Sequence, residues 1–352
     1  MRTAICLLLS ACAYGAPLYT VTDLGSLGAG AMLSLNNGGQ SFGYSQTAAG
    51  RQAFSSAGPL QSAGSESIAN QGNNFGQVTG VTWKDGRAQA TMWANGLVSL
   101  LGVTGATESF GQAINDYGHL AGAAINSSGQ LAAFVMGEGG LRWIGTLPGG
   151  DWSSAYGLNA RGQVAGTSTV AGNAFHAFLW SAEDGMRDLG TLGGASSYAA
   201  AINRDGVVTG HSITASGATH GFVSSESGLR DIGTLDGVSS HAFGINSSGQ
   251  VVGGSGGRAF VYHNAEMADL NRLIAPEAGW ILVEAHAIND TGQIAGLGYH
   301  SGELRAFRLD PAAPLQLELL AAAPPTATPE PGTFGVVAAV VLAASLGLRG
   351  RR

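Results

Sequence analysis

Cysteine is almost missing from this chain of 352 residues. Only Cys6 and Cys12 occur, and both lie in the first dozen residues. A disulfide scaffold and a zinc site with thiolate ligands each need several cysteines in the folded body of a protein. Both are therefore excluded for everything that follows Cys12.

Charge is also scarce, because charged residues make up only 11% of the chain and Lys84 is the single lysine. The net charge is −7, whereas binding to nucleic acid needs a basic surface that neutralises phosphates. We therefore expect no nucleic-acid partner. Glycine fills 57 positions and argues against long helices, while 45% apolar residues are too many for a disordered linker. The composition favours an all-β fold of short strands joined by glycine turns.

The first segment, residues 1–16, reads MRTAICLLLSACAYGA and has the order of a secretory signal: one arginine, an apolar run, then small residues. Cleavage after Ala13 or after Ala16 fits this order, and Pro17 disfavours the second site. The letters LSAC, ending at Cys12, also match a bacterial lipoprotein box, whose cysteine becomes a lipidated N-terminus. An uncleaved anchor is disfavoured because the apolar run is far shorter than the ~20 residues of a helical span. We expect an exported protein.

The other end of the chain has several parts in a fixed order. Residues 312–328 are rich in alanine and proline, which predicts an extended linker. Pro329, Glu330 and Pro331 follow. Residues 332–348 are uncharged and mostly apolar, at the short limit for a transmembrane helix, and the chain stops at RGRR.

This tail, residues 329–352, resembles the PEP-CTERM sorting signal of Gram-negative bacteria, whose signature is the tripeptide P-E-P. The resemblance implies recognition by an exosortase-type enzyme and a transient stay in the inner membrane through the helix. It further implies removal of the tail and delivery to the cell surface or the exopolysaccharide matrix. A plain C-terminal anchor is the alternative, which explains the apolar segment and the arginines but not the tripeptide.

Between the two ends, a pattern centred on an asparagine recurs seven times. In every copy glycine stands three and seven residues after the asparagine, and successive copies are 37 to 44 residues apart. A period of this length is typical of a propeller or a solenoid. The seven asparagines are Asn36, Asn73, Asn115, Asn159, Asn203, Asn246 and Asn289.

Two further elements share this period. One is an x-A-F segment, which ends in a phenylalanine in most copies and in Met92 in the second. The other is DLGTLGG, best seen at 188–194 and echoed at Asp23, Ile144 and Asp231. Together with the I-N-x-x-G-Q-V-x-G core, these elements resemble the HAF repeats of bacterial extracellular proteins, over residues 17–311. The phenylalanines are Phe54, Phe134, Phe178, Phe222, Phe260 and Phe307.

One repeat predicts four short strands. Residues 242–245 are apolar and form the first strand, and 246–249 form a tight turn in which asparagine and glycine satisfy the backbone. Residues 250–253, 258–262 and 266–270 supply the second, third and fourth strands. Four strands in about 40 residues match one propeller blade. The sequence therefore predicts a seven-bladed β-propeller.

The ring of blades has a predicted closure. Residues 19–24 resemble a fourth strand that has no blade of its own, and no clear DLG element follows Phe307. The first strand can therefore complete the last blade and remove an exposed sheet edge. Residues 315–319 compete for the same place.

Each motif that suggests catalysis can be explained by its place in the structural repeat. Ser255 lies in a G-x-S-x-G match, but it occupies the same repeat slot as Ser168 and Ser212, and no strand-to-helix elbow is predicted around it. His176 and His220 are expected to be turn or surface residues. The histidines show no metal-ligand spacing. We therefore predict no catalytic residue, no metal site and no cofactor.

A binding face is the stronger functional prediction. The segments between blades carry Trp152, Tyr156, Tyr198 and His241 among small polar residues, and exposed rings of this kind can stack on sugars. The alternative is that these aromatic residues pack between blades. The leading hypothesis is a non-enzymatic, exported surface or matrix protein with a structural or adhesive role. The rivals are an exopolysaccharide-binding propeller and an extracellular glycan-active enzyme, which would need a carboxylate pair or a metal cluster on the axial face.

Overall fold

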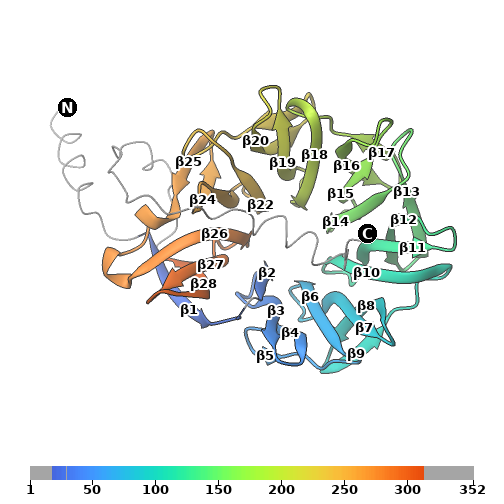
Figure 1. Cartoon of the computed structure of the whole chain (residues 1–352), viewed down its shortest axis with the longest axis horizontal. Coiled ribbons are helices and arrows are strands. Elements are labelled where there is room, and N and C mark those ends of the chain that lie inside the picture. Colours follow the sequence, from blue (N-terminus) through green and yellow to red (C-terminus); the bar gives the residue numbers. More distant parts are fainter. Residues whose placement is uncertain (1–17, 29, 313–352) are drawn as a thin grey trace.

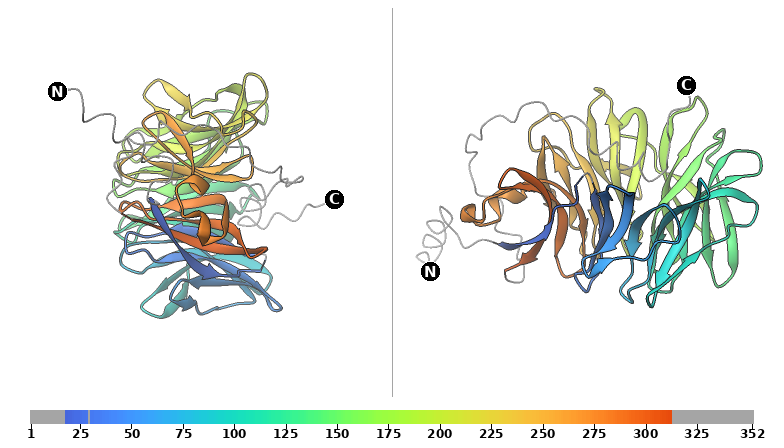
Figure 2. Two further views of the ribbon diagram at one scale, coloured as in Figure 1. Left: turned by 90° about the vertical axis from the view of Figure 1, so that its left-hand side faces the viewer. Right: turned by 60° about the horizontal axis from the view of Figure 1, so that its bottom comes forward.

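A computed structural model describes residues 18–28 and 30–312. These residues form seven antiparallel sheets of four strands each, arranged as blades around a common axis (Figure 1). The views in Figure 2 show the blades side by side in one continuous ring. The prediction of a seven-bladed, all-β repeat is confirmed.

Each blade runs outward from the axis in strand order. The innermost strands are β2 (Ala31–Leu35), β6 (Glu66–Gly72), β10 (Ala106–Ile114), β14 (Ser153–Leu158), β18 (Gly193–Ile202), β22 (His241–Ile245) and β26 (Trp280–Ile288). The second strands are β3 (Ser41–Thr47), β7 (Val78–Lys84), β11 (Leu120–Asn126), β15 (Val164–Thr169), β19 (Val208–Thr214), β23 (Val251–Ser255) and β27 (Ile294–His300).

The outer half of each blade is completed by two more strands. The third strands are β4 (Gly50–Ser55), β8 (Arg87–Ala94), β12 (Leu131–Gly137), β16 (Phe175–Ser181), β20 (Thr219–Ser225), β24 (Arg258–His263) and β28 (Glu303–Pro311). The fourth strands are β5 (Gly58–Pro59), β9 (Leu97–Leu100), β13 (Gly140–Gly145), β17 (Gly185–Asp188), β21 (Gly228–Asp231), β25 (Glu266–Asp269) and β1 (Tyr19–Gly25). Two short 3₁₀ helices, η2 (Leu270–Arg272) and η3 (Pro276–Ala278), follow β25.

The ring closes through the first strand of the chain, as predicted. β1 is the outer strand of the seventh blade and pairs antiparallel with β28, with Tyr19 opposite Pro311. Tyr19 is 1% exposed and belongs to the core of that blade. At the end of the pairing, the Ala312 N–H donates to the Leu18 carbonyl at 2.8 Å. The competing candidate strand, residues 315–319, lies outside the described residues.

The two glycines of each repeat have different physical reasons. Gly249 follows the turn with φ +76°, a left-handed conformation that glycine adopts at little cost. Gly253 lies in β23 and has no room for a side chain: a Cβ there would strike the His241 carbonyl and the Phe260 ring. Phe260 is fully buried. The second glycine of this repeat therefore leaves the space that the ring of the repeated phenylalanine fills.

The membrane helix predicted at residues 332–348 lies outside the described residues, as do the linker, Pro329, Glu330 and Pro331, and the signal segment with Ala13, Ala16 and Cys12. In residues 18–28 and 30–312 there is no helix long and apolar enough to cross a membrane.

Candidate functional site

The seven repeated asparagines form a closed ring of hydrogen bonds around the axis. Each Nδ2 donates to the backbone carbonyl of the asparagine in the next blade, over distances of 2.9 to 3.2 Å. The last of these bonds, from Asn289 to Asn36, joins the seventh blade to the first at 2.9 Å. These side chains therefore link every pair of neighbouring blades. The sequence predicted their turn geometry but not this contact between repeats.

Asn246 illustrates how completely this side chain is used. Its Oδ1 accepts from the backbone N–H of Ser248 at 3.1 Å and of Gln250 at 3.0 Å. Its Nδ2 donates to the Asn289 carbonyl and, at 2.7 Å, to the Gln250 Oε1. The amide thus makes the four hydrogen bonds of which it is capable. The Asn246 amide therefore holds the fold together and has no hydrogen-bonding capacity left for a ligand.

Ser255 has a structural role, which its place in the repeat predicted. Its hydroxyl donates to the Ser239 carbonyl at 2.7 Å and accepts from the Leu235 N–H at 2.9 Å. Ser168 and Ser212 make the same pair of bonds in blades four and five. Ser255 is only 2% exposed and lies at the end of an antiparallel hairpin. A nucleophile elbow requires an exposed serine between a strand and a helix, so the G-x-S-x-G match is a by-product of repeat geometry.

Aromatic and histidine rings form a continuous chain across blades four to seven, which we call the aromatic arc. Successive ring centroids lie 4.8 to 6.2 Å apart, within or near the range of favourable ring pairs. The arc consists, in order, of Trp152, Phe175, Tyr198, His211, His241, Phe243 and His286. It brings together three of the four ring residues predicted from the sequence: Trp152, Tyr198 and His241.

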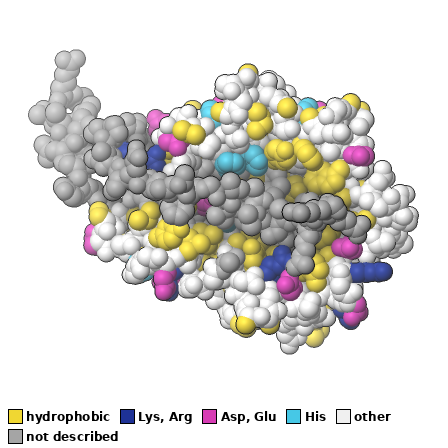
Figure 3. All heavy atoms as spheres, in the orientation of Figure 1, with side chains coloured by type: hydrophobic (Ala, Val, Ile, Leu, Met, Phe, Trp, Pro, Cys, Tyr) yellow, Lys and Arg dark blue, Asp and Glu magenta, His cyan; other side chains and the backbone are white. Residues whose placement is uncertain are grey.

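Two of the predicted rings of the arc lie in inner strands and not in loops as the sequence suggested, whereas Phe175 and His211 lie in β16 and β19. Tyr198 is in β18 and His241 begins β22, while Trp152 directly precedes β14. All rings of the arc except buried His286 keep partial exposure, and Figure 3 shows histidine beside hydrophobic side chains around the centre of one face. The rings pack between blades, because Phe175 of blade four contacts Tyr198 of blade five. The rings of the arc therefore pack between blades and still keep part of their surface exposed.

Tyr156, the fourth predicted ring residue, lies in β14 beside the arc but makes none of its ring contacts. Its hydroxyl has no hydrogen-bond partner among the described residues. Burial raises the pKa of Tyr156 to about 12. Tyr156 keeps partial exposure, as most rings of the arc do, but its hydroxyl is buried.

The histidines of the arc have opposite electrostatic surroundings. Burial, with a smaller contribution from neighbouring His241, lowers the pKa of His211 to about 3. His286 donates from Nδ1 to the Met32 carbonyl at 2.6 Å and from Nε2 to the Glu284 carboxylate at 2.9 Å. Because both partners are acceptors, both nitrogens carry protons. Burial opposes this charge, but the hydrogen bond and charge of Glu284 outweigh it and hold the pKa of His286 above its ordinary value.

Glu284 is the carboxylate of the arc, and it is committed to this ion pair. Burial opposes its ionisation, yet the hydrogen bond from His286 holds the pKa of Glu284 below its usual range. In the described part of the chain, no three His, Cys, Asp or Glu side chains are grouped so that they could hold a metal ion. The rings of the arc can stack on a flat or apolar surface of a ligand. The ionised carboxylate beside them, Glu284, is already paired with His286.

The first residue of the x-A-F element is a histidine or arginine that pairs with an aspartate in four blades. The partner is always the aspartate of the D-L-G element on the neighbouring fourth strand. His176 and His220 belong to this set and lie in β16 and β20, partly buried, so the prediction of turn or surface residues was incomplete. The pairs are His176–Asp188 at 2.8 Å, His220–Asp231 at 2.7 Å, Arg258–Asp269 at 3.3 Å and Arg305–Asp23 at 2.9 Å.

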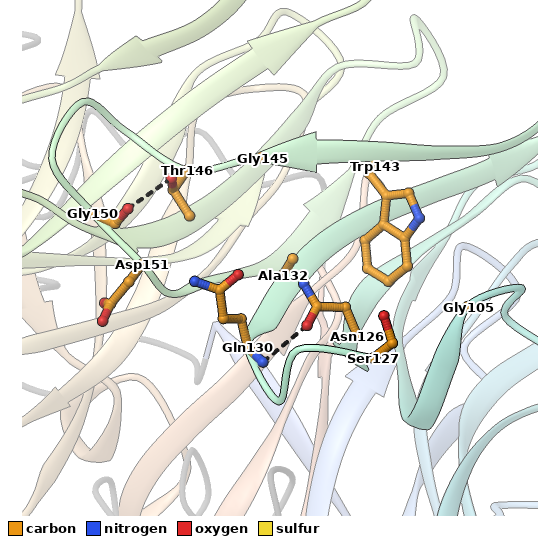
Figure 4. Close-up of a pocket in the computed structure, with 10 residues that line it drawn as sticks. All are labelled: Gly105, Asn126, Ser127, Gln130, Ala132, Trp143, Gly145, Thr146, Gly150 and Asp151. Carbon is orange, nitrogen blue, oxygen red and sulfur yellow. Dashed lines mark hydrogen bonds between the residues drawn. The ribbon is translucent and has the colours of Figure 1, made fainter.

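A groove of about 460 Å³ opens at the outer part of blade three (Figure 4). Trp143 of β13 and Asp151 of the loop to blade four lie at opposite sides of it in this view, with Gln130 and Asn126 between them. Its lining is completed by Gly105, Ser127, Ala132, Gly145, Thr146 and Gly150. No feature of the sequence pattern singled out this groove.

These features define the described chain as a seven-bladed β-propeller whose repeats are locked by polar side chains. No protein-family model matches the chain, and no curated protein matches it by sequence. Among solved structures, a puromycin hydrolase mutant complexed with PGG is similar, with 11% identity and a TM-score of 0.50 over 78% of this chain and 53% of that one.

Other similar structures are TolB from Acinetobacter baumannii and a gluconolactonase from Xanthomonas campestris. TolB has 13% identity and a TM-score of 0.39 over 56% of this chain and 50% of its own. The gluconolactonase has 10% identity and a TM-score of 0.42 over 85% of this chain and 92% of its own. The chain thus spans about half the length of TolB and of the puromycin hydrolase. At 11% identity, the similarity to the puromycin hydrolase supports the propeller fold alone.

Proposed function

We propose that this chain is an exported, non-catalytic propeller of the cell surface or exopolysaccharide matrix, with a structural or adhesive role. The observation that carries the proposal is how the repeated polar side chains are used. The asparagines, the glutamines and Ser255 are bonded to neighbouring strands and blades, so the repeat serves a rigid scaffold. A scaffold of low charge with its edges closed suits a protein that persists outside the cell.

The sorting half of the proposal rests on the sequence of the tail. We expect an exosortase-type enzyme to recognise Pro329, Glu330 and Pro331 and to remove the residues that follow. Intact-mass measurement of the protein recovered from the cell surface tests this directly. A mature C-terminus within or near the tripeptide supports sorting, whereas an intact chain ending in Arg352 contradicts it.

A second candidate function, glycan binding, is favoured by the aromatic arc. Partly exposed rings in a row offer a surface on which apolar sugar faces can stack, and aromatic residues dominate such binding surfaces because they bury large areas. Binding of the matrix polysaccharide to the purified full-length protein, compared with Trp152→Ala, tests this function. Retained binding in the variant removes the arc from the site, and absence of binding by the wild-type protein ends the glycan proposal.

Non-catalysis has its own test. The rival enzyme hypothesis would assign the chemistry to Glu284, the carboxylate of the arc, but that group is paired with His286 at 2.9 Å. We expect no release of reducing or unsaturated sugar ends when the protein is incubated with matrix polysaccharide. Product formation that disappears in Glu284→Gln would overturn the proposal in favour of an enzyme.

A further inference from the structure

We propose that the groove beside Trp143 in blade three is a binding site for a neutral pyranose unit of a polysaccharide. This inference rests on the glycan-binding candidate function and adds a site that is separate from the aromatic arc. The inference starts from a difference between blade three and blades four to seven.

The first observation is a double replacement in the repeat. Phe178, Phe222, Phe260 and Phe307 lie opposite Asp188, Asp231, Asp269 and Asp23, and each aspartate pairs with a histidine or arginine. In blade three the residue opposite Phe134 is Trp143, and the position of the basic residue is taken by Ala132. Blade three therefore lacks both members of this pair. A tryptophan stands in place of the aspartate, and an alanine stands in place of the histidine or arginine.

The second observation is that the groove lies at this exchange. Ala132 and Trp143 are both among its lining residues. In blades four to seven, a histidine or arginine side chain on the third strand reaches an aspartate on the fourth strand, whereas in blade three Ala132 cannot. The volume of about 460 Å³ is within the range of small-ligand sites. Trp143 is 37% exposed, so part of this large hydrophobic residue is open to solvent.

The third observation is the set of polar groups around this ring. The Asn126 Oδ1 accepts from the N–H groups of Ser128 and Gln130, both at 3.0 Å, but its Nδ2 has no partner among the described residues. The side-chain amide of Gln130 and the indole N–H of Trp143 also have none there. Asp151 accepts from the Thr169 hydroxyl through Oδ1 at 3.1 Å, which leaves Oδ2.

This combination matches the chemistry of a sugar. A pyranose has an apolar face of C–H groups, which can lie against an indole ring, and a rim of hydroxyls, each of which donates and accepts hydrogen bonds. Amides and a carboxylate satisfy both roles. Asp151 is the only charged lining residue, and the chain as a whole carries −7. Like charges repel a polyanion, so the groove favours a neutral sugar over a uronic-acid polymer.

The test is isothermal titration of the full-length protein with cellohexaose and maltohexaose as neutral probes and alginate oligomers as the anionic probe. We expect at least one neutral probe to bind, and Trp143→Ala to weaken it by about tenfold or more, as for removal of a central aromatic contact. Phe75→Ala, at an exposed ring outside both the groove and the aromatic arc, should bind that probe as the wild type does.

A second variant rebuilds the ion pair of the other blades. The double substitution Ala132→His with Trp143→Asp copies the pair His176–Asp188 of blade four. We expect this variant to keep the melting temperature of the wild type and to lose binding of the neutral probe. With an unchanged melting temperature, loss of binding reports a lost site, whereas an unchanged melting temperature with full binding contradicts the groove assignment.

The outcomes are distinct for the two proposals. If the wild type binds a neutral probe and both blade-three variants bind it equally well, the groove assignment is wrong and glycan binding stands. If only alginate binds, the inference of a neutral sugar is wrong. If none of the probes and no matrix polysaccharide binds, the candidate glycan function fails and the groove proposal fails with it.

Discussion

At the scale of single residues, the side chains that the repeat retains are those with the most hydrogen bonds. Each repeated asparagine is buried, closes its own turn and reaches the next blade, as Asn246 does with 3% exposure. The two residues between the asparagine and the glycine differ from copy to copy. In some copies the first of them bonds to the equivalent position of a neighbouring blade, as the Ser247 N–H does with Asp290. A buried amide that has lost its partners costs about 1 to 3 kcal/mol.

The asparagine ring leads to a stability prediction. Replacing Asn246 by alanine removes the bond to the Asn289 carbonyl and leaves two turn N–H groups without their acceptor. We expect the free energy of unfolding to fall by about 2 kcal/mol, measured by urea denaturation. Ser248→Ala, in the same turn but exposed, is the control and should change it by less than about 0.5 kcal/mol. Equal effects of the two substitutions would show that the ring contributes nothing.

His211 leads to a prediction about acid. Its folded-state pKa is about 3, against an ordinary value of 6.5, so between these values the unfolded chain binds a proton that the folded chain does not. Stability is therefore lost as the pH falls through this window. His211→Phe keeps the ring between Tyr198 and His241 but cannot titrate.

We expect the wild type to lose about 2 kcal/mol more unfolding free energy than His211→Phe between pH 7 and pH 4.5. Urea denaturation at both pH values measures this difference. The Glu284–His286 pair is present in both proteins and cancels in the comparison. Parallel pH dependences for the two proteins would contradict the assignment of this effect to His211.

At the scale of elements, the sequence predicted the blade well. The four strands expected between residues 242 and 270 correspond to β22 (His241–Ile245), β23 (Val251–Ser255), β24 (Arg258–His263) and β25 (Glu266–Asp269). The reason is that turn chemistry and strand alternation are local and are repeated seven times. What this local pattern could not give is which strand faces the axis, so Tyr156, Tyr198 and His241 were placed in loops although they lie in inner strands.

The closing strand β1 offers a test at this scale. Tyr19 is buried against the core of the last blade, but its hydroxyl has no hydrogen-bond partner among the described residues. Tyr19→Ala should cost about 3 kcal/mol through the cavity it leaves. Tyr19→Phe should be neutral or stabilising, because it removes an unsatisfied buried hydroxyl.

Thermal and urea denaturation of both Tyr19 variants measure these effects, with Thr20→Ala at the neighbouring exposed position as the control. An alanine variant as stable as the control would mean that β1 does not hold the ring closed. A phenylalanine variant that is strongly destabilised would mean that the hydroxyl has a partner that matters.

At the scale of the whole molecule, the blades form a closed ring although they are built from a linear chain. The first and last described segments meet where the Ala312 N–H bonds to the Leu18 carbonyl at 2.8 Å (Figure 1). A loop between blades five and six includes Val238, which is 67% exposed. Adjacent ends of a folded domain and an exposed loop are the conditions under which circular permutation succeeds.

We expect a permutant that joins residue 312 to residue 18 by a short glycine linker, and opens the chain between Gly237 and Val238, to fold as a monomer. Far-ultraviolet circular dichroism and size-exclusion chromatography measure this. A second permutant, opened between Asn246 and Ser247, is the matched comparison, since it interrupts a turn of the asparagine ring and should melt at a lower temperature. If the first permutant does not fold and the second does, the proposal that the chain can be opened in this loop without loss of the ring is contradicted.

The sequence alone determined the repeat, the four strands of a blade, the number of blades and the closure by residues 19–24. Each of these follows from local turn chemistry, from alternation and from period, all of which are written along the chain. Tertiary structure decided what lies between blades: the asparagine ring, the aromatic arc and the paired Glu284 and His286. It also decided the groove at Trp143, because Ala132 and Trp143 gain meaning only when their positions are compared with the ion pairs of other blades. These contacts depend on how strands and blades pack, even where the residues are close in the sequence, as Ala132 and Trp143 are, and no local pattern encodes that packing.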